Sequence, residues 1–231
     1  ELGNYDGTLV GLAGTGASKV WITGKFGNSI NLNPPSGYAH LGGVPISGDF
    51  TVSLWVRSDD VTIDGGVILA KDNIPTMKLF RIEQDTSDGH VKVVFHKDGG
   101  ADTVSLTSSS PVLTNDEWTH LALSYRENNA TLTLYAEGNK TNEITNANLS
   151  GSALSSRLSD LRLGDTTGSV QGRVDDLRIY STALSDSEIS TIYGQAGGDF
   201  DNIEIMGAAL QRSLHTKQVM THTPQHYRWI I

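Results

Sequence analysis

Apolar residues recur at every second position through much of the chain. In "DFTVSLWVR" (49–57) the alternate residues from Phe50 to Val56 are apolar and share one face of an extended backbone. The same alternation returns in four further segments that are rich in β-branched and aromatic residues: 77–84, 90–96, 118–125 and 130–136. Because successive side chains of a strand point to opposite faces, this pattern predicts strands that bury one face.

Short clusters of turn-forming residues separate these segments. They are "TIDGG", "TSDG", "HKDGG", "RENN" and "AEGN", and their Gly, Asp and Asn favour the conformations of tight turns. Many short strands with turns between them are typical of an antiparallel sandwich or barrel rather than of alternating strands and helices. We therefore predict an all-β fold.

One segment near the end of this pattern predicts a helix. In "SDSEISTIY" a serine, Ser185, is followed three residues later by Glu188, which is the spacing of a capping box. Ile189 and Ile192 then lie on one helical stripe, and Gly194 suits the end of the helix. The sequence predicts a short helix with one buried face.

Composition and charge exclude several classes of function. The chain of 231 residues contains no cysteine, which excludes disulfides, cysteine zinc sites and thiol nucleophiles. It has no apolar run of eighteen residues, so we expect no insertion into a membrane. The formal net charge is −9 and the 17 Lys and Arg are scattered, which argues against nucleic acid as a partner. This composition is compatible with a bacterial protein that works outside the cell, its export signal removed.

The segment "GRVDDLRIYSTALSDSEI" resembles the C-terminal signature of laminin-G-like jelly rolls in the concanavalin-A-like lectin and glucanase superfamily. Three further parts resemble the same family in the same order: "YDGTL" with "GKFGNSINL" and "YAHL", then "GDFTVSLWVR", then "NDEWTHLALSY". The resemblance covers residues 4–194. It implies a two-sheet antiparallel jelly-roll sandwich over 1–195 with one short C-terminal helix, and it leaves 196–231 as a tail or a partial appended segment.

The start of the chain departs from the family pattern. The family opens with an apolar and aromatic strand ahead of the segment that contains "GNYDGTL", and this sequence begins inside that segment. An unpaired edge beside the final strand would favour association with other chains. We therefore expect "DFDNIEI" (199–205) of the tail to pair beside that final strand.

Two adjacent aspartates, Asp175 and Asp176, stand in the final strand of the resemblance. Strict alternation places Asp175 on one face with Leu177, and Asp176 on the other with Arg178. Calcium takes six to eight oxygen ligands, and the resemblance implies that the aspartate at Asp175 holds a structural Ca²⁺. The alternative is that Asp175 accepts hydrogen bonds from loop N–H groups, while Asp176 pairs with an arginine near the surface. We therefore predict Asp175 and Asp176 as the metal-binding residues.

This sequence does not contain a complete pattern of catalytic carboxylates. Relatives of this fold that cleave glucans use a Glu-x-Asp-x-Glu pattern, which places three acids on one face of a strand. Here Glu83 and Asp85 match the first two positions, but Ser87 occupies the third. We therefore assign no catalytic residue, and activity as a polysaccharide hydrolase or lyase remains the alternative.

Saccharide binding needs an aromatic platform and polar side chains around it. The candidates are Trp21, Asp72, Arg81, Glu83 and His96. We expect a non-catalytic carbohydrate-binding, lectin-like module that binds a polysaccharide or glycan and belongs to a larger extracellular or cell-surface chain. An adhesion or spacer module is the third hypothesis.

Overall fold

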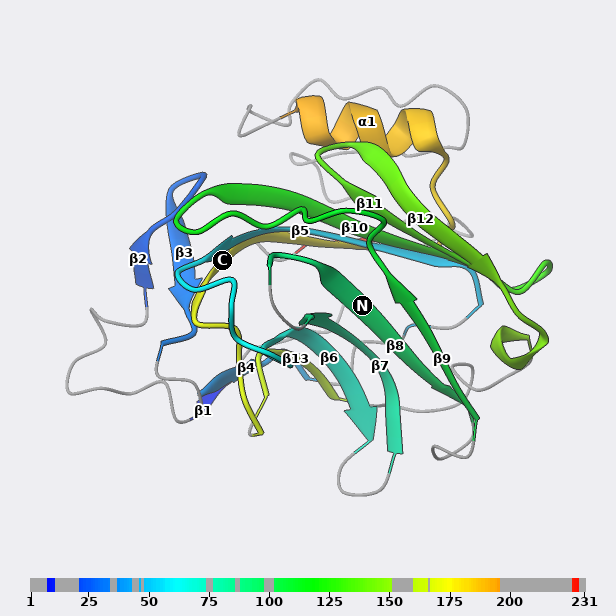
Figure 1. Ribbon diagram of the computed structural model, residues 1–231, viewed down its shortest axis with the longest axis horizontal. Coiled ribbons are helices and arrows are strands. Elements are labelled where there is room, and N and C mark those ends of the chain that lie inside the picture. The colour runs from blue at the N-terminus through cyan, green and yellow to red at the C-terminus, as the bar shows by residue number, and fades with distance from the viewer. Residues whose placement is uncertain are drawn as a thin grey trace, which may run out of the picture.

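The computed structural model describes the following residues: 8–10, 21–33, 37–42, 46, 48–73, 77–85, 88–97, 102–150, 160–165, 167–195 and 226–228. Two antiparallel sheets face each other in these residues (Figure 1). The predicted all-β sandwich is therefore confirmed. The division of the chain into 1–195 and a tail stays a prediction, because most of the tail lies outside the described residues.

The first sheet, called the front sheet here, has seven strands in the order β1-β4-β13-β6-β7-β8-β9. Its strands are β1 (Thr8–Val10), β4 (Tyr38–His40), β6 (Val67–Asn73), β7 (Met77–Gln84), β8 (Val91–Lys97), β9 (Asp102–Thr107) and β13 (Asp160–Leu163). Each neighbouring pair is antiparallel.

The second sheet, called the back sheet here, has eight strands in the order β12-β11-β10-β5-β14-β3-β2, with β15 paired to β14. Its strands are β2 (Trp21–Thr23), β3 (Asn28–Asn31), β5 (Phe50–Ser58), β10 (Trp118–Arg126), β11 (Thr131–Ala136), β12 (Asn139–Thr145), β14 (Gly172–Tyr180) and β15 (His226–Arg228). A short 3-10 helix, η2 (Ala147–Leu149), follows β12.

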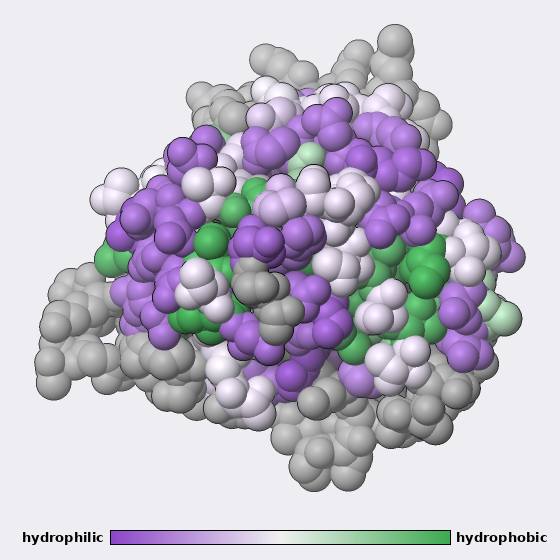
Figure 2. All heavy atoms as spheres, viewed as in Figure 1, coloured by the Kyte–Doolittle hydropathy of each residue, from purple (hydrophilic) through white to green (hydrophobic). Residues whose placement is uncertain are grey.

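The core lies between the two sheets and is built from one face of each strand. The alternate residues from Phe50 to Val56 are all buried in it, as the alternation predicted. Phe50 stacks on Phe80 of the front sheet with ring centroids 5.5 Å apart. In the same view the surface is largely hydrophilic, with apolar residues in small groups (Figure 2). The apolar side chains are thus used mainly for packing between the sheets.

The helix α1 (Asp186–Gly194) covers the outer side of the back sheet (Figure 1). The capping box is confirmed, because Ser185 and Glu188 bond reciprocally at its start. Ile189 and Ile192 are buried in a second apolar cluster that contains Ala122, Tyr135, Tyr180 and Leu184. Gly194 was expected to follow the helix, but it is the last helical residue, and Gln195 is the C-cap.

A tight turn between β11 and β12 brings the end of α1 close to the sheet. Glu137 and Gly138 both have positive φ, 52° and 74°, as in the two-residue turns that match the twist of a hairpin. A Cβ added to Gly138 would lie 2.9 Å from atoms of the Tyr193 side chain. Gly138 therefore permits both the turn and the close approach of Tyr193.

A strand of the tail pairs beside β14, the final strand of the sandwich. Residues 226–228 form β15, which pairs antiparallel with Arg178–Tyr180. The predicted strand 199–205 lies outside the described residues. A tail segment does lie at this edge, but the part that the structure describes there is β15.

Candidate functional site

The outer face of β7, β8 and β9 in the front sheet carries a regular array of polar side chains. Core residues alternate with them along each strand, as Phe80 and Ile82 do on either side of Arg81. The register places the outward residues in three rows across the strands: Arg81–Val94–Ser105, Glu83–Lys92–Thr107 and His96–Thr103. These side chains are half-buried or exposed, so the array faces solvent.

Arg81 is held at one side of this array by a buried carboxylate. Arg81 Nη2 donates to Asp165 Oδ2, and Asp165 is only 2% exposed. Arg162 Nη1 lies 3.5 Å from Asp165 Oδ1, and its guanidinium is 5.3 Å from the centroid of the Tyr38 ring. Ala70, directly between the two arginines in the sheet, presents only a methyl group. One carboxylate thus fixes two guanidinium groups.

Five other polar side chains of the array are also paired. Lys92 Nζ lies 3.7 Å from Glu83 Oε1. His96 Nδ1 and the Thr103 hydroxyl are 3.2 Å apart. Asp85, at the end of β7, accepts from the Thr107 hydroxyl at 3.3 Å. These contacts order the side chains before any ligand arrives, which lowers the entropy cost of binding.

The structure brings three of the five predicted ligand-binding residues together. Arg81, Glu83 and His96 share the outer face of β7–β9. Asp72 is paired through its backbone in β6, and its side chain is not among those that the structure describes. Trp21 is 41% exposed, but it lies on β2 at an edge of the back sheet. Trp21 is therefore separate from the other three.

Sequence reasoning did not identify Lys92, which belongs to this array, nor the buried residues Arg162 and Asp165 beside it. Arg162 stands between Leu161 and Leu163 in "LRL", an alternation that indicates an outward-facing side chain. Lys92 occupies the same kind of position in "VKV". Asp165 follows a strand end and has no comparable signal, because its contacts come from the folding of the β13–β14 loop.

The two adjacent aspartates do not face opposite ways as strict alternation predicts. A β-bulge shifts the register between Asp175 and Arg178, and Asp176 has a φ of 47°. Asp175 is paired with Trp55 and Arg178 with Ser53, so both lie on the outer side of the back sheet. The prediction that Asp175 shares the face of Leu177 and Ile179 is wrong, because the extra residue of the bulge resets the alternation.

Asp175 is buried and holds backbone donors. Its carboxylate accepts from the N–H groups of Phe26 at 2.8 Å and Asp176 at 2.7 Å. Burial raises the pKa of Asp175, while those two N–H groups lower it and the negative charge of Asp176 raises it. Asp175 therefore fastens the turn between β2 and β3 to the end of the sheet.

Asp176 pairs with an arginine, as its alternative reading predicted, but not at the surface. Arg178 donates through Nε and Nη2 to the two carboxylate oxygens of Asp176. Asp176 is 6% exposed and Arg178 is 5% exposed. Burial alone would lower the pKa of Arg178, but Asp176 and Tyr180 more than offset this and raise it. The pair is thus a buried, charged unit.

These contacts bear on the predicted calcium ion. Both oxygens of Asp175 already accept N–H groups, and Asp176 is bound to a guanidinium. Among the described residues there is no group of three or more Asp, Glu or His that could hold a metal ion. Calcium needs at least six oxygens, and the carboxylates of Asp175 and Asp176, bonded as they are, do not supply such a set by themselves. The calcium ion stays a prediction.

We expect a calcium chelator to leave the melting temperature of this protein unchanged, because hydrogen bonds satisfy Asp175. The measurement is thermal unfolding with and without EDTA, for the wild type and for Asp175→Asn. A metal bound only by the native state would stabilise it by mass action. A drop in melting temperature with EDTA that Asp175→Asn abolishes would instead establish the calcium site.

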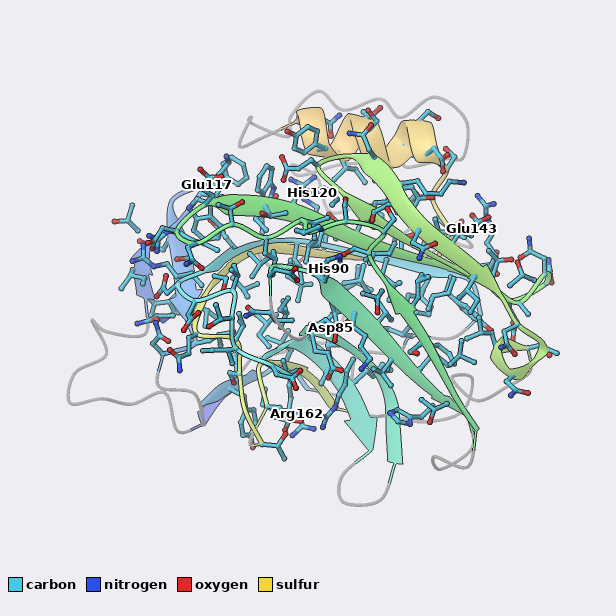
Figure 3. All side chains as sticks on the ribbon, viewed as in Figure 1. Asp85, His90, Glu117, His120, Glu143 and Arg162 are labelled. Carbon is cyan, nitrogen blue, oxygen red and sulfur yellow. The ribbon has the colours of Figure 1, made fainter. Side chains whose placement is uncertain are left out.

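A second cluster of polar and aromatic side chains lies under α1. His120 is fully buried, with Nε2 2.8 Å from the Ser53 hydroxyl and no hydrogen-bond partner at Nδ1 among the described residues. Its ring lies 5.4 Å from Trp55 and 5.7 Å from Tyr193 of α1. Figure 3 shows His120 on the α1 side of the sandwich and Arg162 on the opposite side. His120 itself is closed to solvent and is therefore out of reach of a large ligand.

The comparisons with known proteins agree with this fold. The sequence matches the family Laminin_G_3, described as concanavalin A-like lectin/glucanases superfamily, over residues 29–190. It is 24% identical over 164 residues to the adhesion G-protein coupled receptor V1 of Danio rerio. That match covers 68% of this chain and 3% of the receptor, so the chain spans a small part of this relative's length.

Two solved structures share the arrangement of the two sheets. Domain 4 of AbnA, a GH43 extracellular arabinanase from Geobacillus stearothermophilus in complex with arabinotriose, superposes with a TM-score of 0.64 at 23% identity. The match covers 81% of this chain and 87% of that domain. The botulinum neurotoxin serotype D ligand-binding domain, in complex with N-acetylneuraminic acid, gives a TM-score of 0.60 at 14% identity. That match covers 83% of this chain and 46% of the toxin domain. At these sequence identities, the two comparisons show a shared fold alone.

Proposed function

This chain belongs to the Laminin_G_3 family of the concanavalin A-like lectin/glucanases superfamily, and from that premise we propose that it is a non-catalytic module that binds glycans. The observation that carries the proposal is the paired polar array on the outer face of β7–β9. Guanidinium, carboxylate, ammonium and imidazole groups stand there in fixed positions beside Val94. A sugar hydroxyl can donate to a carboxylate and accept from a cation at the same time.

Two related structures contain saccharides and support this reading. Arabinotriose is bound in the complex of the arabinanase domain, and N-acetylneuraminic acid in that of the toxin domain. The fold alone does not decide function, so the proposal depends on the array itself. No helix among the described residues has the length and apolar character needed to cross a membrane. We propose an extracellular or cell-surface location in a bacterial, multidomain protein, as the extracellular arabinanase and the much longer adhesion receptor suggest.

A glycan array followed by calorimetry on the best oligosaccharide tests the proposal. We expect Arg81→Gln to weaken binding by about 10- to 100-fold, since a hydrogen bond to a charged group contributes about 1.5–3 kcal/mol. We expect His96→Ala to weaken it by about 2- to 10-fold, since a neutral hydrogen bond contributes about 0.5–1.5 kcal/mol. The product mixture is also assayed for cleavage, and we expect none. Cleavage by the wild type would favour the hydrolase or lyase alternative.

Two variants on the back sheet serve as controls. Arg126→Gln removes an exposed arginine from β10, and Trp21→Ala removes the exposed ring of β2. We expect both to bind as the wild type does. Loss of binding in Trp21→Ala alone would move the site to β2, and an absence of saccharide binding in the wild type would favour the spacer hypothesis.

A further inference from the structure

Charges on the outer face of β7–β9 and beside it cancel within that surface. Three described cations there have an anionic partner: Asp165 lies against the guanidinium groups of Arg81 and Arg162, and Glu83 against the ammonium of Lys92. Asp85, bonded to Thr107, adds one more carboxylate at the end of β7. Counting only the Lys, Arg, Asp and Glu side chains that the structure describes on and beside this face, three positive charges therefore face three negative ones. These described side chains carry no local excess of positive charge.

From this balance we propose that the ligand is an uncharged saccharide and that Asp165 and Glu83 set this preference. The inference rests on the proposed glycan-binding function and concerns the same site. A uronic acid or another acidic sugar would place its carboxylate near Glu83, where like charges repel, and Arg81, neutralised by Asp165, would not compensate for this. The net charge of −9 for the whole chain adds to that repulsion. A neutral sugar meets no such penalty, because its hydroxyls bond to both members of an ion pair.

Asp165 acts in this selection as a positioning residue. It is 2% exposed, so its carboxylate is not a group that a ligand reaches directly. The loop after β13 holds it in place, since the Asp165 N–H donates to the Ser169 hydroxyl at 3.0 Å and the Thr167 hydroxyl donates to its carboxylate at 3.3 Å. Asp165 therefore affects the ligand only through Arg81, because it fixes the position of the guanidinium group and neutralises its positive charge.

The test uses an array that carries neutral oligosaccharides beside their uronic acid counterparts of equal length. Oligogalactosides are compared with oligogalacturonides, and oligoglucosides with oligoglucuronides, at low and at physiological ionic strength. We expect the wild type to bind neutral members only, with an affinity that changes little with salt. Binding controlled by net charge would weaken steeply with salt.

Glu83→Gln is the decisive variant, and Glu143→Gln is its matched control. Glu83→Gln leaves Lys92 uncompensated on the proposed site. Glu143→Gln likewise removes a carboxylate from a lysine, Lys140 on β12 of the back sheet, whose Nζ is 3.5 Å from Glu143 and keeps Asp186 at 3.9 Å. We expect Glu83→Gln to raise the affinity for the acidic oligosaccharides about tenfold at low salt, which is about 1.4 kcal/mol. We expect no change for Glu143→Gln.

Asp165→Asn removes the carboxylate between the two arginines and should shift the preference in the same direction. Because Asp165 is buried, this variant is first checked for folding, and Glu83→Gln decides the question if Asp165→Asn does not fold. A wild type that binds acidic sugars in a salt-sensitive manner overturns the inference and leaves glycan binding intact. A wild type that binds no saccharide at all overturns the proposed function and the inference with it.

Discussion

Acidification from pH 7 to pH 4 should remove about 3 kcal/mol from the free energy of unfolding through a single residue, His120. Its burial, and to a smaller extent the positive charge of Arg178, lower the pKa of His120 from 6.5 to about 4. In the unfolded chain His120 takes up a proton near pH 6.5, whereas in the folded chain it does so only near pH 4. The unfolded state therefore binds more protons between these values, and stability falls by about 1.4 kcal/mol per pH unit as the pH is lowered.

The surroundings of His120 explain why a proton is not tolerated there. Ser53 faces its Nε2, and the rings of Trp55 and Tyr193, which stack on each other with centroids 5.8 Å apart, both lie beside it. Arg178 adds a like charge. Glu137 accepts the backbone N–H of His120 at 2.6 Å, and its hydrogen bond with Tyr193 raises the pKa of that tyrosine. An imidazolium would need water, so we expect α1 to loosen before the rest of the sandwich.

Urea unfolding followed by tryptophan fluorescence between pH 7 and pH 4 measures this effect. Near pH 4 the Asp175 carboxyl changes the free energy of unfolding in the opposite direction to His120, because its pKa is raised in the folded state. The contribution of His120 is therefore taken as the difference between the wild type and His120→Gln. His90→Gln is the matched control, since His90 lies beside Asp88 near the surface of the front sheet. If the wild type and His120→Gln lose stability in parallel, the assigned role of His120 is wrong.

Replacing Asp176 by Asn should cost about 3–5 kcal/mol, because it leaves the Arg178 guanidinium buried without its anion. Asn keeps the shape of the side chain and tolerates the φ of 47° at this position, so the change removes charge without adding backbone strain. Stability is measured by urea unfolding at neutral pH. Combining Asp176→Asn with Arg178→Met should recover part of the loss, because the uncompensated charge is then gone.

The chain contains a close control for this substitution. Asp116 also has a positive φ, 66°, and also pairs with an arginine, Arg57, but its side chain is 66% exposed. Water screens that pair, so we expect Asp116→Asn to cost no more than about 1 kcal/mol. Equal losses from Asp116→Asn and Asp176→Asn would show that burial does not determine the strength of the Asp176–Arg178 pair.

The strands and the helix were predictable because their signals are local. Alternation identified the core face of β5, and the pair of Ser185 and Glu188 identified the start of α1. The break in the alternation of side chains at Asp176 was not predictable, because a bulge depends on how β14 pairs with β5. Strict alternation therefore failed at the one place in β14 where the backbone carries an extra residue.

The candidate site was predictable only in part, for a related reason. Alternation along one strand shows that Arg81 and Glu83 face the same way, and His96 follows from the same rule on the next strand. Asp165 is 84 residues from Arg81 in the chain, and no local pattern connects the two. Trp21 looked like a candidate for the same site, but strand order places β2 in the other sheet.

Periodicity, turn residues and the family signature were enough to predict a two-sheet sandwich, since each of them depends on neighbouring positions in the chain. The roles of the charged side chains depend instead on how distant segments pack together. Arg81 is neutralised by a distant loop, Asp175 and Asp176 lie on one side of a bulged strand, and His120 is sealed beneath α1. Electrostatic environment depends on distance and burial in three dimensions, and the order of residues along the chain specifies neither directly.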